Sequence, residues 1–107
     1  MSSNTVDMVV YRKEDSMKVS LVGGLDRLEP HYRNEAKKAG HELRVFLQYE
    51  SGMESKLRST EALVLFTSMV SHSARNLALQ TAKSGGMTIV QSHSSGVAAF
   101  RECLAGL

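Results

Sequence analysis

Three of the four histidines lie where a predicted strand gives way to a predicted helix. They are His31, His72 and His93, and His72 stands between two serines in the stretch MVSHSAR. Ligands of parallel sheets gather at such junctions, beyond the carboxyl ends of the strands. A neutral imidazole is the commonest metal ligand among side chains, so these residues could hold a metal or a haem iron. The fourth, His41, falls on the opposite edge and is expected to be a surface residue.

A haem also needs apolar walls and partners for its propionates, and the same edge offers residues of both kinds. Apolar candidates are Leu25, Met53, Met69 and Val70. Propionate partners are Arg27, Arg33 or Arg75, and hydrogen-bond donors are Tyr32 or Tyr49. The pattern is compatible with haem b, and any of the three histidines could be the axial ligand.

Glycines and serines at this edge indicate a second chemistry, the binding of a phosphorylated small molecule. Gly23 and Gly24 follow the first apolar run, and Ser71 and Ser95 precede two predicted helices. Backbone N–H groups at helix amino termini can hold an anion, and serine hydroxyls can either assist or simply cap the helix. Leu-Asp-Arg follows the glycine pair, so neither a dinucleotide fingerprint nor a P-loop is present. Both roles for the serines stay open.

Other chemistries lack the residues they require. No G-x-S-x-G elbow is present for a nucleophilic serine, and the only cysteine, Cys103, lies late in an amphipathic helix where a buried, inert thiol is expected. We therefore expect a protein that is not an enzyme. A net charge of +2 does not favour nucleic acid, and no apolar run is long enough for a membrane span. The single cysteine and the absence of a secretory signal favour the cytoplasm.

The elements that position these residues alternate along the chain of 107 residues. Strand-length apolar runs occupy residues 18–22, 43–47, 62–66 and 87–90, and the segments between them have helical spacing. Strands joined by crossover helices lie parallel in one sheet. The sequence predicts one α/β domain over residues 17–107, a small doubly wound, Rossmann-like sheet of four strands in the order 2-1-3-4 with helices on both faces.

Residues 1–16 fit this pattern less well. The segment DMVVY at residues 7–11 could form an edge strand, an arm that pairs with a partner chain, or part of a frayed tail. Sheet edges and this segment both invite pairing, so we expect a homodimer.

Three stretches resemble the bacterial domain-of-unknown-function family 2325 (DUF2325). They are VSLVGGLDRLEPHYRNEAKKAGHEL, VSHSARNLALQTAKSGG and SSGVAAFRECL, and the resemblance extends over residues 17–107. The family pattern combines a strand ending in Gly-Gly, a first helix with His and Tyr, a Val-Ser-His leading into a helix, and a Ser-Ser-Gly opening the last helix. The matching positions are Gly23, Gly24, Arg27, Tyr32, Ser71, His72, Ser95 and Gly96.

The resemblance implies a haem-binding role in some members, with oxygen or another diatomic gas at the open iron position. It favours His72 as the metal ligand, with His31 and His93 in reserve, because His93 is not part of the family pattern. The leading prediction is therefore a small haem-binding protein, and a module that binds a phosphorylated small molecule is the alternative. Many members carry cysteines beside the Val-Ser-His segment, and Thr67, Ser68 and Met69 stand there in this chain. A metal site built on cysteines is therefore not expected here.

Overall fold

Four apolar segments form a parallel sheet in the computed structural model of this protein, which describes residues 16–107. The strands are β1 (Lys18–Val22), β2 (Glu42–Phe46), β3 (Ala62–Phe66) and β4 (Thr88–Ser92). They pair in the order β2-β1-β3-β4, and every pairing is parallel, which confirms the predicted topology. The segment DMVVY at residues 7–11 lies outside the described residues.

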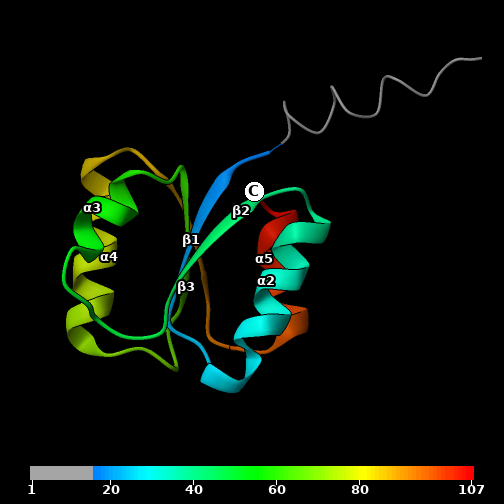
Figure 1. The fold of residues 1–107 in the computed structure, drawn as a ribbon. Helices are drawn as coiled ribbons and strands as arrows, with labels where there is room; N and C mark the ends of the chain where they lie inside the picture. The colour runs from blue at the N-terminus through cyan, green and yellow to red at the C-terminus, as the bar shows by residue number, and fades with distance from the viewer. Residues whose placement is uncertain (1–15) are drawn as a thin grey trace, which may run out of the picture.

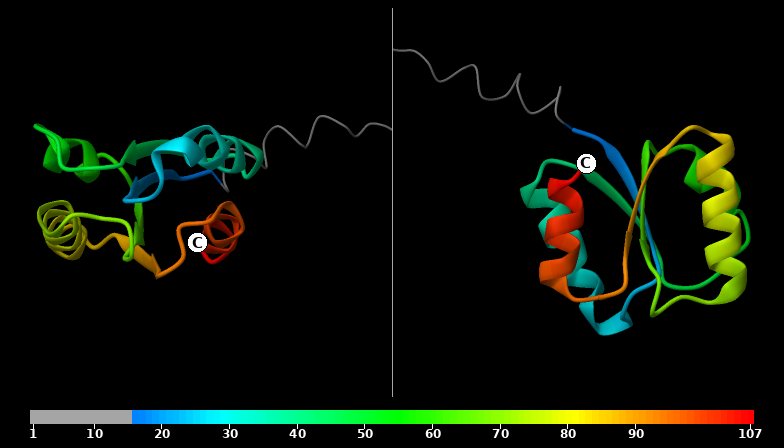
Figure 2. Two further views of the ribbon diagram at one scale, coloured as in Figure 1. Left: turned by 90° about the horizontal axis from the view of Figure 1, so that it is seen from below. Right: turned by 180° about the vertical axis from the view of Figure 1, so that it is seen from behind.

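Helices cover both faces of the sheet, as the sequence predicts (Figure 1). They are α2 (Glu29–Lys38), α3 (Met53–Arg58), α4 (His72–Ser84) and α5 (Val97–Ala105), and a short 3-10 turn, η1 (Asp26–Leu28), precedes α2. Helices α3 and α4 lie on one face and α2 and α5 on the other, which the two further views in Figure 2 also show. No helix within residues 16–107 has both the length and the apolar character needed to cross a membrane.

The handedness of the crossovers explains which helix covers which face. The chain moves outward from β1 to β2 and then reverses past β1 to reach β3 and β4. Right-handed connections that run in opposite directions place their helices on opposite faces. Helix α2 therefore lies on one face, and α3 and α4 on the other. The chain reverses between β1 and β3, and open sheets of this kind usually bind ligands at the loops that follow the two strands at such a reversal.

Burial follows the position of each strand in the sheet. All five residues of the central strand β3 are buried, whereas β2, at one edge, alternates between exposed and half-buried residues up to Phe46. A central strand covered on both faces needs a continuous apolar run, and β3 has one in Ala-Leu-Val-Leu-Phe. The face under α2 and α5 contains three aromatic rings that contact one another, those of Tyr32, Phe66 and Phe100.

An ion pair joins the two helices on this face. The Arg101 guanidinium on α5 donates to both carboxylate oxygens of Glu35 on α2, at 3.0 Å each. Glu35 is 8% exposed, and Lys38 lies 3.8 Å from the same carboxylate. The hydrogen bonds from Arg101 lower the pKa of Glu35, because they stabilise the charged form more than partial burial opposes it.

We predict that Glu35→Gln makes stability less sensitive to acid. With its pKa lowered in the folded state, Glu35 stabilises the fold above the ordinary pKa of a carboxyl group, and this contribution is lost as the pH falls through the lowered value. The free energy of urea unfolding should therefore fall more steeply with acid in the wild type than in the variant. Glu54→Gln is the control, since its partner Arg58 is one turn away on the same helix and both side chains are exposed. Equal slopes for wild type and Glu35→Gln would contradict the assignment.

Candidate functional site

The carboxyl ends of the four parallel strands meet at one edge of the sheet, the lower edge in Figure 1. The loops that leave this carboxyl edge carry most of the predicted site residues. Which of those side chains are free for a ligand depends on how the loops contact one another.

The loop after β1 is packed tightly against the loop after β3. The Gly24 N–H donates to the Met69 carbonyl at 2.9 Å, and the Gly23 N–H donates to the Phe46 carbonyl at 2.8 Å. Both glycines have positive φ, 93° and 112°, which residues with a side chain rarely adopt. A Cβ at Gly23 would lie 2.7 Å from the Met69 carbonyl oxygen. The glycine pair is therefore explained by backbone packing, and its N–H groups are used within the protein rather than offered to a phosphate.

Tyr32 lies in the core, directly against the glycine loop that follows β1. It is fully buried, and its hydroxyl accepts a hydrogen bond from the Leu25 N–H at 3.1 Å and donates one to the Ser95 carbonyl at 2.6 Å. The ring also lies against Gly24, where a Cβ would be 3.1 Å from the Tyr32 hydroxyl. Tyr32 thus joins the loops that follow β1 and β4, and its hydroxyl is already engaged on both sides.

The three histidines of the carboxyl edge do not form a shared metal site. His31, His72 and His93 are all exposed, on α2, on the first turn of α4 and on the loop after β4. Within residues 16–107, no cluster of three or more His, Cys, Asp or Glu side chains could hold a metal ion. Any metal held by one of these imidazoles would need its remaining ligands from a cofactor or from solvent.

Other predicted residues have ordinary surroundings. Arg27 is exposed on η1, and Tyr49 is 54% exposed on the loop after β2. His41 is not on this edge, as expected, and its Nδ1 accepts a hydrogen bond from the Met17 N–H. Cys103 is buried, and burial raises the pKa of its thiol, so this sulfur stays protonated at neutral pH.

A small cavity lies at the amino terminus of α4. Its volume is about 170 Å³, and it is lined by Thr67, Val70, His72 and Arg75. The Ser71 side chain caps the helix by accepting a hydrogen bond from the Ala74 N–H at 3.2 Å, so this serine has the capping role. The Arg75 N–H makes the first backbone bond of the helix, to the Ser71 carbonyl at 3.0 Å, so the N–H groups of His72 and Ser73 precede the hydrogen bonds within the helix.

This cavity is positively charged. The first turn of α4 contains no acidic residue, and the helix dipole is positive at its amino terminus. The Nε of Arg75 is buried and has no hydrogen-bond partner among the described residues. By contrast, Arg33, Arg58 and Arg101 each donate to a carboxylate. An unpaired guanidinium N–H beside a helix amino terminus is suited to bind an anion.

A second buried polar atom without a partner lies at the same edge. Within residues 16–107, the only two such side-chain atoms are the Nε of Arg75 and the hydroxyl oxygen of Ser95. Ser95 is 7% exposed and directly precedes Gly96, at the start of α5. Buried polar groups are nearly always hydrogen-bonded, so two exceptions at one edge indicate a ligand or ordered water there.

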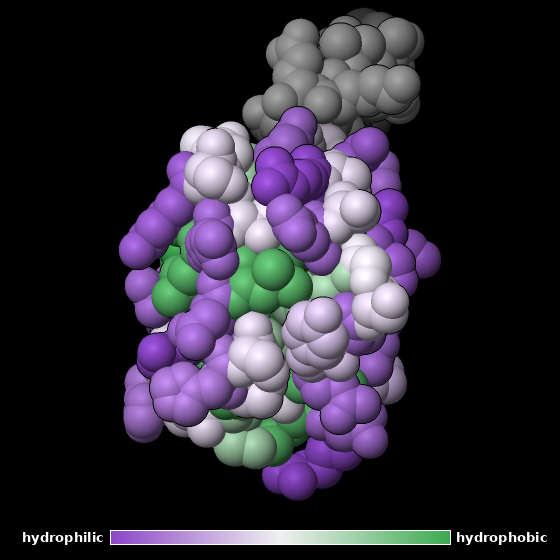
Figure 3. All heavy atoms as spheres, turned by 90° about the vertical axis from the view of Figure 1, so that its left-hand side faces the viewer, coloured by the Kyte–Doolittle hydropathy of each residue, from purple (hydrophilic) through white to green (hydrophobic). Residues whose placement is uncertain are grey.

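An apolar side chain, that of Met69, is exposed in the loop that lines the cavity. Met69 is 44% exposed, and Met69 and Tyr49 are the two large hydrophobic side chains that are exposed within the described part of the chain. Figure 3 shows hydrophobic atoms at the surface at the lower end of the molecule, which is the carboxyl edge. A second hollow of about 360 Å³, lined by Gly24, Asp26, Leu47 and Gln48, lies at the same edge. The edge therefore combines a cationic cavity with apolar surface.

The surroundings of Arg75 are not visible in the sequence. Composition and spacing do not distinguish it from Arg27 and Arg33, the other two candidates for a haem propionate. One signal was available, because Arg75 follows the capping Ser71 by four residues and so lies one helical turn beyond it. Thr67 and Val70, which line the same cavity, belong to a loop whose course the sequence does not show.

Comparison with known proteins supports the resemblance found in the sequence. The family described as "Uncharacterized protein conserved in bacteria (DUF2325)" matches residues 18–107, which is most of the chain. No curated protein shows significant sequence similarity to it. The match covers all four strands and the four α-helices that position the carboxyl edge.

We predict that Tyr32→Phe lowers the free energy of unfolding by about 1–3 kcal/mol, because it leaves the Leu25 N–H and the Ser95 carbonyl without their buried partner. Urea unfolding followed by circular dichroism measures the loss. Tyr49→Phe is the matched control, since that side chain is exposed and its hydroxyl should contribute less than about 0.5 kcal/mol. A Tyr32→Phe protein as stable as the wild type would contradict the structural role of this hydroxyl.

Proposed function

The chain belongs to the DUF2325 family, and we propose that it is a binding module, not an enzyme, for a small phosphorylated molecule. The anionic group of this ligand occupies the cavity at the amino terminus of α4. The observation that carries the proposal is the buried Nε of Arg75, which has no partner among the described residues. The free thiol of Cys103 supports a reducing compartment, and we propose the cytoplasm as its location.

Charge and size both favour an anion of phosphate dimensions. Arg75 supplies a fixed positive charge, the α4 amino terminus adds its dipole, and Thr67 and His72 can donate hydrogen bonds. A cavity of about 170 Å³ is smaller than the roughly 300–1,000 Å³ typical of sites for whole small molecules. The cavity therefore accepts one charged group, and the rest of the ligand lies outside it.

The body of the ligand lies on the apolar surface next to the cavity. Met69 is exposed there, and its backbone joins the cavity loop to Gly24, which lines the neighbouring hollow. A ligand that extends from Arg75 toward this hollow would cover apolar atoms that are otherwise exposed to water. The surface thus suits an amphipathic molecule with an anionic end.

Haem b is a second candidate ligand, because His72 and Arg75 line the same cavity. His72 could supply the axial nitrogen, and Arg75 could pair with a propionate. Bound haem would supply an iron with an open position for a diatomic gas. The hollows of this edge measure about 170 and 360 Å³ and neither encloses a macrocycle, so a haem held by these residues would lie at the surface, against Met69.

We predict that inorganic phosphate and phosphorylated nucleosides raise the melting temperature of the wild type, and that Arg75→Gln weakens their binding about tenfold or more. A hydrogen bond to a charged group contributes about 1.5–3 kcal/mol, which corresponds to this range. Calorimetric titration gives the dissociation constants. Arg58→Gln is the control, because it removes an arginine whose partner is Glu54 on the surface of α3. Binding that is absent in the wild type, or equal in Arg75→Gln, would refute the phosphate site.

The haem candidate has a separate readout. Haem added to the purified protein should give a strong Soret band that is lost in His72→Ala and kept in His31→Ala and His93→Ala. Those two variants are matched controls, because both imidazoles are exposed at the same edge. A protein that stays colourless would exclude haem, and the phosphate titration would still decide the first proposal.

A further inference from the structure

The outer edge of β2 has no strand beside it within residues 16–107, because β2 pairs with β1 alone. The Glu42 N–H donates to the Met17 carbonyl, and the Phe46 carbonyl accepts from Gly23, so both of these backbone groups point inward toward β1. Backbone groups of alternate residues point to opposite sides of a strand. The N–H and C=O groups of Leu43 and Val45 therefore point outward, where a further strand could pair with them.

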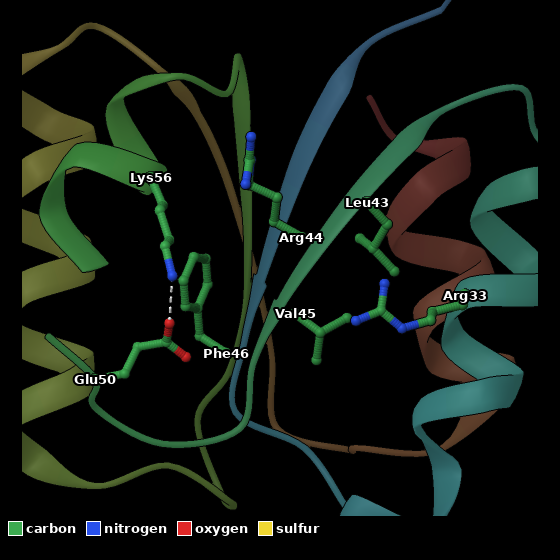
Figure 4. A pocket seen from close by; sticks show the side chains of 7 residues that line it. All are labelled: Arg33, Leu43, Arg44, Val45, Phe46, Glu50 and Lys56. Atoms are coloured by element: carbon green, nitrogen blue, oxygen red, sulfur yellow. Dashed lines mark hydrogen bonds and ion pairs between the residues drawn. The ribbon is translucent and has the colours of Figure 1, made fainter. Parts of the chain in front are cut away.

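This edge is open between the two helical layers. A cavity of about 230 Å³ runs along β2 and is lined by residues 43–46. Its other lining residues are Arg33 of α2, Lys56 of α3, and Glu50 in the loop before α3. Figure 4 shows Leu43 and Val45 on the side of α2 and Arg44 on the side of α3. Glu42 and Arg44 are exposed, and neither forms an ion pair within residues 16–107. The helices thus flank the strand and leave its edge accessible.

We propose that a second copy of this chain pairs with this edge, with the two β2 strands antiparallel and a two-fold axis at Leu43. In this register Glu42 of each copy lies opposite Arg44 of the other, so the interface contains two charge pairs. Leu43 lies opposite its own counterpart. The strand Glu-Leu-Arg is then complementary to itself, and the two sheets join into one of eight strands.

The neighbouring registers are less favourable. A two-fold axis at Arg44 would place this arginine opposite its counterpart and Glu42 opposite Phe46, and like charges directly opposite each other destabilise a pair of strands. An axis at Val45 would place Arg44 opposite Phe46. Both alternatives forfeit the charge pairs. Charge therefore selects the register at Leu43.

The backbone geometry agrees with this register. Leu43 points its N–H and C=O outward, so an axis at Leu43 makes a hydrogen-bonded pair in which the two copies exchange both bonds. Glu42 and Arg44 then form the adjacent pairs that are not hydrogen-bonded. Side chains of such pairs lie closest together in antiparallel sheets, which brings each carboxylate near a guanidinium.

Complementary charge reversals test the proposal on the chain of 107 residues. Wild type should sediment as a dimer in analytical ultracentrifugation. Glu42→Arg places two arginines opposite each other, Arg44→Glu places two glutamates opposite each other, and each variant alone should dimerise at least about tenfold more weakly. An equimolar mixture of the two variants restores both charge pairs and should recover the dimer. Circular dichroism checks that each variant folds, which is expected because both side chains are exposed.

Cysteine cross-linking tests the register. Leu43→Cys should form a disulfide-linked dimer under mild oxidation, because the two Leu43 positions lie opposite each other. Val45→Cys should not, because Val45 of one copy lies opposite His41 of the other, four residues away from the second Val45. The wild type is the control for both variants, because its one cysteine, Cys103, is buried and should form no cross-link. A wild-type chain that stays monomeric at all concentrations would overturn the proposal. So would a dimer that neither charge variant weakens, or a cross-link that forms only in Val45→Cys.

Discussion

The arrangement of the carboxyl edge depends on the close approach of two loops, at the hydrogen bond between the Gly24 N–H and the Met69 carbonyl. Only residues without a side chain can bring the loop after β1 this near to the loop after β3. Tyr32 then fills the space under the contact and binds the loop after β4 through the Ser95 carbonyl. Three loops that are far apart in the chain are thereby held by one buried cluster.

This contact also determines where a ligand can bind. In open parallel sheets the usual site is the crevice between the strands at which the chain reverses, here β1 and β3. In this protein the glycine loop fills that crevice, and its N–H groups are already bonded. The cationic group that we propose for the ligand is Arg75, which lies one helix turn beyond the capping Ser71 of α4. It lines a cavity together with Thr67 and Val70. The site that we propose is therefore displaced from the crevice to the amino terminus of α4.

Sequence patterns predicted the fold because strands and helices depend on local periodicity. The apolar run of β3 and the capping Ser71 are visible in a few consecutive residues. The roles of single side chains depend on partners distant in the chain. Tyr32 was expected to serve a ligand, yet its hydroxyl donates to a carbonyl 63 residues away. Spacing cannot show that an imidazole such as His93 is exposed, or that the Nε of one arginine, Arg75, is buried without a hydrogen-bond partner among the described residues.

The two-fold pairing that we propose at β2 would affect the ligand site. Antiparallel pairing turns the carboxyl edges of the two copies in opposite directions, so the two cavities lie at opposite ends of the joined sheet. A partner bound at β2 would not cover the apolar surface at Met69, and a flat ligand there could not be enclosed between the two copies. One direct connection between the β2 edge and the glycine loop is Phe46, whose carbonyl accepts a hydrogen bond from the Gly23 N–H at the end of β2. Because binding couplings are reciprocal, a ligand that shifts the glycine loop would change dimerisation by the same factor by which the dimer changes ligand affinity.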